Sequence, residues 1–236
     1  MLQVKNIVVN KGNEEILSDI SFRVEVGEFI NIIGPSGGGK STLLRTLNGL
    51  DGIDRGDIQY NGRSIFDTDL IQVRKEIGYV FQFPYLFGER VRENIEYPLQ
   101  LHSIYLDDHY IQKLLKALGL KSDILEKNCK ELSGGEQQRI SLMRTMMLKP
   151  KVLLLDEVTA SLDPVSTKLV EEFLTDLNEV YQTTIIMVTH NIEQARRMGK
   201  RTIFISAGKL QEDMPTADFF NKPTNEAIGS FIKKAE

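Results

Sequence analysis

A glycine-rich segment between an apolar run and a helical stretch constrains this chain more than any other feature. Residues 34–42 read Gly-Pro-Ser-Gly-Gly-Gly-Lys-Ser-Thr and fit the pattern G-x-x-x-x-G-K-[ST]. Phe29–Ile33, directly before it, are nearly all apolar and predict a strand buried on both faces. Ser41–Asn48 place their leucines on one stripe and predict a helix that ends at Gly49. This order of strand, turn and helix is typical of phosphate-binding α/β proteins.

Each part of the segment has a chemical role in holding phosphate. The glycines let successive backbone N–H groups curl around phosphate oxygens, in conformations that a side chain would obstruct. The following helix adds its positive dipole end and its unpaired N–H groups. Lys40 can reach the β- and γ-phosphates, and the Ser41 hydroxyl can ligate Mg²⁺. We therefore predict that a nucleotide binds to Gly34, Pro35, Ser36, Gly37, Gly38, Gly39, Lys40, Ser41 and Thr42.

Another predicted strand, Val152–Leu155, ends in the carboxylates Asp156 and Glu157. In folds with this phosphate loop a strand-end Asp commonly holds Mg²⁺ through water, so we assign that role to Asp156. Glu157 is placed to orient or deprotonate an attacking water. A solvated acidic turn is the alternative interpretation, and the phosphate loop upstream favours the functional one. His190 ends the next predicted strand, 184–189, and should face the same crevice at the carboxyl edge of a parallel sheet. His102 and His109 have no such setting and are predicted to be surface residues of the helical region.

The order of predicted elements indicates an α/β core interrupted by a helical insertion. Between Phe83 and Leu132 helical periodicity replaces β-branched runs, whereas from Lys151 onward apolar strands alternate with helices, including one at about Val165–Val180. Strands separated by helices imply a parallel sheet with right-handed crossovers. Further strands are predicted at 3–9, 20–26, 57–60, which precedes an Asn-Gly turn, and 77–82.

Composition narrows the class of protein. The 236 residues are 41% hydrophobic and 26% charged, which is average for a globular chain that can bury a sizeable core. The formal net charge of −4 argues against a nucleic-acid partner. Cys129 is the single cysteine, which excludes an internal disulfide and a multi-cysteine metal site. No apolar run approaches the roughly 18 residues of a membrane helix, and no signal peptide is visible, so we expect a soluble chain.

The segment Leu132–Arg139, Leu-Ser-Gly-Gly-Glu-Gln-Gln-Arg, opens another predicted helix and has two interpretations. Ser133 and Glu136 match the S-x-x-E capping box, in which case the glycines are turn residues. The second interpretation is another phosphate-binding helix N-terminus, with Ser133 and the glycine amides as donors. A simple enzyme with one phosphate loop needs no second such end, so it would complete the nucleotide site of another subunit.

Together these segments resemble the ATP-binding cassette ATPases. The resemblance is carried, in the family's order and spacing, by residues 34–42, Gln82, 132–139, 155–157, 161–163 and His190. It implies a P-loop NTPase fold: a RecA-like α/β core with a mostly parallel sheet, an antiparallel β subdomain and an inserted α-helical subdomain. It also implies one domain over 1–236, with the core in 1–82 and 151–236 and the helical subdomain, which carries the 132–139 segment, in 83–150.

The same resemblance implies that the ligands are ATP and Mg²⁺, with the metal held by Ser41, Gln82 and Asp156. Glu157 would be the catalytic base, and His190 would contact the γ-phosphate and hold the attacking water. Asp163 would communicate between paired sites. The implied assembly is a head-to-tail homodimer in which each ATP lies between one subunit's phosphate loop and the other's signature helix. That helix would contribute Ser133, Gly134, Gly135, Glu136 and Gln137.

Two positions depart from the family's pattern. An aromatic residue that stacks on adenine is usual where this chain has Lys11, so base selectivity should be loose. The family's usual serine before Ala-Leu-Asp is replaced by Ala160, with Ser161 displaced by one position. We still expect Asp163 to function.

The resemblance also narrows the kind of cassette ATPase. The short interval from Gln82 to Ser133 excludes relatives with a long coiled coil, and a single phosphate loop excludes tandem types. An apolar patch, Phe81, Phe83, Tyr85, Leu86 and Phe87, is either subdomain core or the groove that receives a membrane subunit. We expect a peripheral ATPase subunit on the cytoplasmic face of a bacterial-type membrane, bound to separate membrane-spanning permease subunits.

The sequence also bears on the substrate that such a transporter would carry. Residues 122–163 are similar to iron-export and phosphate-type bacterial ATPases, which favours an inorganic ion as the transported substrate. The alternative is a soluble cassette ATPase that acts as a regulator or assembly factor. No segment for an appended regulatory domain is expected beyond the core.

Overall fold

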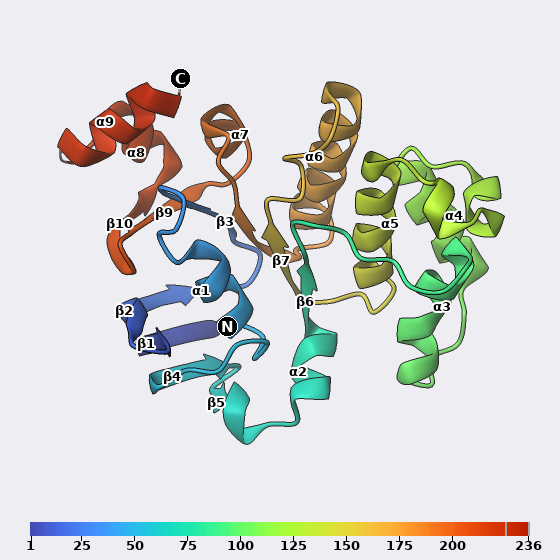
Figure 1. Ribbon diagram of the computed structural model, residues 1–236, viewed down its shortest axis with the longest axis horizontal. Coiled ribbons are helices and arrows are strands. Elements are labelled where there is room, and N and C mark those ends of the chain that lie inside the picture. The colour runs from blue at the N-terminus through green and yellow to red at the C-terminus, as the bar shows by residue number, and fades with distance from the viewer. Residues whose placement is uncertain (225, 236) are drawn as a thin grey trace.

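A six-stranded sheet forms the central layer of the computed structural model, which describes residues 1–224 and 226–235 (Figure 1). The strand order is β10-β9-β3-β8-β7-β6, and only the β9–β10 pair is antiparallel. All residues of β3, β6, β7 and β8 are buried, which explains their nearly uninterrupted apolar sequences. The strands are β3 (Phe29–Ile33), β6 (Ile77–Val80), β7 (Val152–Asp156), β8 (Thr184–Val188), β9 (Arg201–Ser206) and β10 (Lys209–Pro215).

A second, antiparallel sheet in the order β2-β1-β4-β5 packs beside the first (Figure 1). Apolar side chains of β1, β3, β9 and α1 share one buried cluster, so this sheet and the first helix are held to the same core. Asn61 and Gly62 both have positive φ and form the tight turn between β4 and β5. The elements are β1 (Leu2–Lys11), β2 (Glu14–Val24), β4 (Arg55–Tyr60), β5 (Arg63–Ser64) and α1 (Lys40–Thr46).

The remaining helices lie in two groups at opposite ends of the molecule, with α6 between them (Figure 1). One group follows β6 and consists of α3 (Val91–Leu101), α4 (Asp108–Ala117), the 3₁₀ turns η2 (Ser122–Glu126) and η3 (Cys129–Glu131), and α5 (Gly134–Met146). The other group consists of α7 (Ile192–Arg197), α8 (Thr216–Asn221) and α9 (Glu226–Ala235). The 3₁₀ turn η1 (Ile65–Asp67) and α2 (Leu70–Glu76) connect the two sheets, and α6 spans Pro164–Glu179.

The structure confirms the α/β fold expected from the sequence, with a mostly parallel sheet, an antiparallel sheet and an inserted helical region. The ends of some strands differ from those predicted from the sequence. β6 ends at Val80, so Gln82 lies beyond the strand predicted for 77–82. β2 begins at Glu14 rather than at Ile20, because its first half pairs with β1 across a turn that contains Gly12 with φ of 62°.

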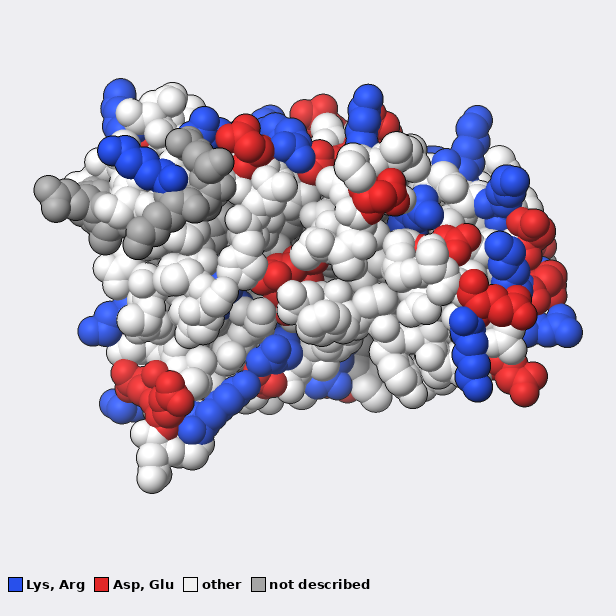
Figure 2. Space-filling view, turned by 45° about the horizontal axis from the view of Figure 1, so that its top comes forward, with Lys and Arg blue, Asp and Glu red and all other residues white. Residues whose placement is uncertain are grey.

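Charge is distributed without a dominant sign on the face in Figure 2. Lys and Arg side chains are interspersed with Asp and Glu, and uncharged residues cross the middle of the face. Over the described residues of this face there is no continuous basic band of the kind typical of nucleic-acid binding surfaces. Within the described part of the chain, no helix combines the length and apolar character that crossing a membrane requires.

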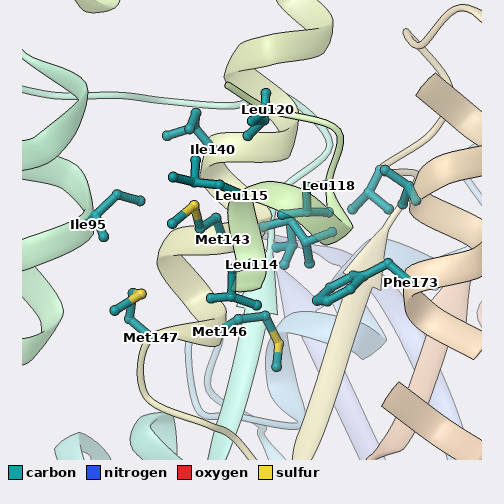
Figure 3. Close-up of a cluster of buried hydrophobic side chains, with 14 of the residues drawn as sticks. Ile95, Leu114, Leu115, Leu118, Leu120, Ile140, Met143, Met146, Met147 and Phe173 are labelled. Atoms are coloured by element: carbon teal, nitrogen blue, oxygen red, sulfur yellow. The ribbon is translucent and has the colours of Figure 1, made fainter. Parts of the chain in front are cut away.

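The inserted helical region has an apolar core that is continuous with one face of the large sheet. Figure 3 shows the ring of Phe173, on α6, pointing toward Leu114 and the side chains that α4 and α5 contribute. Leu114 is 3% exposed. Because this cluster joins the insertion to α6 and the sheet, it fixes the position of α5 relative to the strand ends.

Leu114→Ala tests the contribution of this core. Removing the side chain leaves a cavity between helices that cannot close fully, so the free energy of unfolding should fall by about 2–5 kcal/mol in a urea titration. Leu101→Ala is the matched control, because Leu101 belongs to the same region but is 59% exposed. It should change stability by no more than about 0.5 kcal/mol. Equal effects of the two substitutions would contradict the assigned core.

Candidate functional site

The glycine-rich loop connects β3 to α1 and has backbone geometry that requires glycine at both of its ends. Gly34 has φ of 148°, and an added Cβ would lie 1.9 Å from the carbonyl oxygen of Ile205 on the neighbouring β9. Gly39, the N-cap of α1, has φ of 98°, and its Cβ would lie 2.8 Å from Leu17. Side chains at these positions would collide with β9 and β2, so the sequence pattern reflects steric exclusion as well as phosphate chemistry.

Lys40 is the first residue of α1, and its side chain curls back over the loop. The Nζ atom donates to the carbonyl oxygens of Gly34 at 2.9 Å and Pro35 at 2.8 Å. The residue is only 5% exposed. Burial lowers the pKa of the Lys40 ammonium, while the negative charges of Glu157 and Asp156 oppose that shift. Lys40 is therefore a buried cation held at the loop and close to both carboxylates.

Asp156 ends β7 and receives hydrogen bonds from two neighbouring elements. The Ser41 hydroxyl on α1 donates to Oδ1 at 2.9 Å, and the Tyr79 hydroxyl on β6 donates to Oδ2 at 2.8 Å. Burial raises the pKa of Tyr79 far above its ordinary value, and the negative charge of Asp156 adds to the shift. Tyr79 therefore stays neutral and keeps its proton as a donor.

Glu157 lies one residue beyond β7 and is held between two side chains from other loops. Gln82 Nε2 donates to Oε2 at 2.8 Å, and His190 Nε2 lies 2.6 Å from Oε1. The backbone of Glu157 has φ of 50°, which is uncommon for a residue with a side chain. Its N–H donates to the carbonyl oxygen of Val188 at 3.0 Å. The edge of the sheet thus presents one carboxylate fixed by three segments of the chain.

Comparison with known proteins identifies the protein family. Residues 17–160 match the ABC transporter family. "Phosphate import ATP-binding protein PstB 2" of Aliivibrio fischeri is 38% identical to this chain, over 98% of the chain and 89% of the relative. The protein with the same name in Lactobacillus acidophilus is 37% identical, over 98% and 97%. The chain belongs to the ABC transporter family.

Solved structures agree with the family. A dimeric ATP-binding cassette, MJ0796, in a post-hydrolysis state with ADP and Pi, has a TM-score of 0.83 at 30% identity. The match covers 92% of this chain and 99% of that one. CbiO1 of Clostridium perfringens, described as part of an ABC transporter complex, has a TM-score of 0.80 at 27% identity, over 94% and 90%. This chain is therefore an ABC ATPase that binds and hydrolyses ATP.

Within this ABC ATPase, the structure brings some of the predicted site residues together directly. Ser41 and Asp156, both assigned to the metal from the sequence, are hydrogen-bonded to each other. Gln82, assigned to the same metal, is hydrogen-bonded to Glu157. Asp163 lies further along the chain, where its carboxylate caps the N-terminus of α6 by accepting from the N–H groups of Val165 and Ser166.

The signature segment of this ABC ATPase forms the capping box that its sequence allows. The Ser133 hydroxyl accepts from the Glu136 N–H at 3.2 Å, and the Glu136 carboxylate accepts from Ser133 N at 2.9 Å. The backbone N–H of Ser133 is the largest cause that lowers the pKa of Glu136. Ser133 and Gly134 are exposed, and a Cβ on Gly134 would meet no atom within 4 Å. The N-terminus of α5 is thus open to another molecule.

Two further predictions concern single side chains. Lys11 at the end of β1 is half-exposed and forms an ion pair with Asp51 at 3.6 Å, while Arg45 also contacts Asp51. The role of Lys11 toward a base stays a prediction. His102 and His109, predicted as surface residues of the helical region, are half-buried and exposed respectively.

Sequence reasoning missed three polar residues of the site: Tyr79, Thr159 and Gln194. Tyr79 sits in the apolar run of β6 and looks like a core residue until β6 is paired with β7, which places it next to Asp156. Gln194 lies four positions after His190 on a helix that periodicity did not single out. Its position just after a strand-end histidine is the only signal that the sequence offers.

Tyr79→Phe tests the support of Asp156. The substitution keeps the ring but leaves Oδ2 without this donor, so the free energy of unfolding should fall by about 1–3 kcal/mol. Because folding raises the pKa of Tyr79, its stabilising contribution is present below the ordinary tyrosine pKa and is lost only above it, so the loss should be constant from about pH 7 to 9. Tyr105→Phe, at a residue 91% exposed, is the control and should be neutral. A loss that disappears by pH 8 would contradict the assignment.

Proposed function

We propose that this chain is the ATP-hydrolysing subunit of a transporter that imports phosphate through separate membrane-spanning subunits. The observation that carries the hydrolytic part is the Glu157 carboxylate, held by Gln82 and His190 and adjacent to Asp156. The relatives named for phosphate import, at up to 38% identity over 98% of the chain, favour phosphate over the iron-export alternative. Such a subunit works at the cytoplasmic face of the membrane.

Hydrolysis of ATP needs a base, a positioned water and stabilised phosphate charge. We assign the base to Glu157: its carboxylate takes a proton from water while the water oxygen bonds to the γ-phosphorus and the bond to the β-phosphate oxygen breaks, giving ADP and phosphate. We assign His190, whose Nε2 lies 2.6 Å from Glu157 Oε1, to hold the same water and the γ-phosphate. The Lys40 ammonium and the loop amides balance the negative charge of the phosphates.

The oxygen-rich group at Ser41 and Asp156 fits Mg²⁺. The hydroxyl and the carboxylate lie 2.9 Å apart, and hard cations of this size prefer oxygen ligands together with water and substrate phosphates. Ser41, Gln82 and Asp156 would hold the metal. When bound, Mg²⁺ would neutralise charge on the β- and γ-phosphates.

We further propose that two copies close around two ATP molecules, with Asp163 near the partner's site. Support comes from the open N-terminus of α5, where Ser133 and Gly134 face outward. In the single chain, the Ser133 hydroxyl donates to Glu136 at 3.0 Å. To donate to a phosphate on the other copy, Ser133 must turn from this carboxylate, so ATP has to compete with an intramolecular anion.

The surface beside Gln82 provides a docking face for the membrane-spanning subunit. Phe81, Phe83 and Tyr85 are 44%, 79% and 75% exposed, which is unusual for neighbouring aromatic residues. Leu86, in contrast, packs on the core of the helical region. We propose that the exposed side chains receive an apolar segment of the partner, and that residues 83–150 act as one helical subdomain that carries this face.

Glu157→Gln should stop turnover while ATP still binds, because the amide cannot accept the proton from water. We expect a stable ATP-bound dimer in size-exclusion chromatography and an ATPase rate reduced by roughly 100-fold or more. Lys40→Ala should instead weaken nucleotide binding, since it removes charge from the loop. Glu172→Gln, an exposed carboxylate on α6, is the control that should retain wild-type turnover. Turnover that survives Glu157→Gln would exclude Glu157 as the base.

Substitution of Phe83 and Tyr85 by Asp tests the membrane partner. Both residues are largely exposed, so the isolated chain should fold and hydrolyse ATP normally. In vesicles containing the reconstituted complex, the double variant should lose phosphate uptake and co-purification with the permease, whereas Tyr105→Asp should retain both. If ATP drives accumulation of another ion but not of phosphate, the substrate assignment is wrong although the docking face stands.

A further inference from the structure

Gln194 connects the segment that follows Glu157 with the segment that precedes His190. The residue lies on α7 and is 1% exposed. Its Nε2 donates to the Thr159 hydroxyl at 2.8 Å, and its Oε1 accepts from the Thr189 hydroxyl at 2.7 Å. Thr159 is two residues beyond Glu157, and Thr189 is the residue before His190. One buried amide therefore bridges the two loops that carry the reacting side chains.

An ion pair holds the side-chain amide of Gln194 in one orientation. Glu171 on α6 accepts from Gln194 Nε2 at 2.8 Å, so the nitrogen faces the carboxylate and the oxygen faces Thr189. Arg197 in turn holds Glu171 with two hydrogen bonds of 2.6 and 2.9 Å. Because Glu171 accepts from both partners, a flip of the Gln194 amide would place an oxygen against a carboxylate.

The backbone of Glu157 adopts an uncommon conformation that depends on neighbouring residues, including those that Gln194 bridges. A residue with a side chain at φ of 50° is less stable than one in an ordinary conformation and persists only where its surroundings hold it. The turn after Glu157 is closed by the Ala160 N–H, which donates to the Glu157 carbonyl oxygen at 3.0 Å. Thr159 lies inside this turn, and its hydrogen bonds to Gln194 anchor the turn to α7.

The loop of His190 is anchored through the same atoms. The Thr189 hydroxyl, besides donating to Gln194, accepts from the Asn191 N–H at 3.0 Å, so it spans His190 on both sides. The side-chain oxygen of Asn191 accepts from the N–H of Gln194 at 2.9 Å and caps α7. A shift of Gln194 would therefore move both loops and change the 2.6 Å separation between Glu157 and His190.

We propose that Gln194 and Thr159 are positioning residues for ATP hydrolysis, which hold Glu157 and His190 in register by hydrogen bonds between their loops. The inference rests on the roles proposed above for Glu157 and His190. Neither Gln194 nor Thr159 needs to touch the nucleotide. Their effect is to keep the side chains of the base and the histidine in the mutual arrangement that the structure shows, with 2.6 Å between Glu157 Oε1 and His190 Nε2.

Thr159→Val removes the hydroxyl but keeps the shape of the side chain. We expect kcat for ATP hydrolysis to fall roughly 10-fold or more while the KM for ATP changes less than about 2-fold, since the phosphate loop is untouched. Thr159→Ser, which restores the hydroxyl, should return kcat to within about 2-fold of wild type. Thr202→Val is the matched control, because Thr202 is fully buried and hydrogen-bonded to Thr216 but lies on β9 outside the site.

Gln194→Leu should give the same split, with kcat reduced and KM retained. The double variant with Thr159→Val should be no slower than Gln194→Leu alone, because the Thr159 hydroxyl acts through its hydrogen bonds to Gln194, which Gln194→Leu already removes. A kcat for Thr159→Val equal to that of Thr202→Val, or a loss that Thr159→Ser does not rescue, would overturn the proposal. Measuring Glu157→Gln in parallel distinguishes a failure of the base assignment from a failure of the positioning role. If it retains turnover, the assigned base is wrong; if it alone stops turnover, only the positioning role fails.

Discussion

The parallel pairing of β3, β8 and β7 is the constraint on which the rest of the site depends. Parallel strands end at the same edge of a sheet, so the phosphate loop after β3, the carboxylates at the end of β7 and His190 after β8 arrive at one place. These segments are far apart in the sequence. Packing on both faces of the three buried strands fixes their register, because a one-residue slip would move every side chain to the opposite face and disrupt its packing.

These segments bring several charged side chains to one edge of the sheet, where neighbouring groups of the protein stabilise them. Lys40 lies among loop carbonyls and near two carboxylates, which offset the tendency of burial to neutralise it. Asp156 is surrounded by hydroxyl donors from Ser41 and Tyr79 rather than by a second cation. Hydroxyl donors hold an anion without cancelling its charge, so Asp156 remains an attractive partner for a metal.

The sequence predicted the parts of the fold that local chemistry determines. The phosphate loop, the strand-end carboxylates and the helices with strong periodicity lie where their patterns indicated, because glycine requirements and apolar spacing act over a few residues. The hydrogen bond of Tyr79 and the network around Gln194 could not be predicted in this way. They depend on which strands and helices become neighbours, and a buried tyrosine or glutamine has the same local pattern whether or not it faces a site.

The helical insertion begins close to Glu157 and returns at the other edge of the sheet. It follows β6 at the edge where β7 ends in Asp156, and it re-enters the sheet at Val152, the start of β7. β6 and β7 are neighbours in the sheet although the entire insertion lies between them in the chain. Gln82, the last residue before the insertion, donates to Glu157, while Gln138 on α5 donates to the carbonyl oxygen of Phe81 at 3.0 Å. The exposed aromatic face begins at Phe81 itself. Phe81 is thus separated from Glu157 by a single intervening residue, Gln82, so a partner docked on the proposed face would need no long pathway through the protein to act on the proposed base.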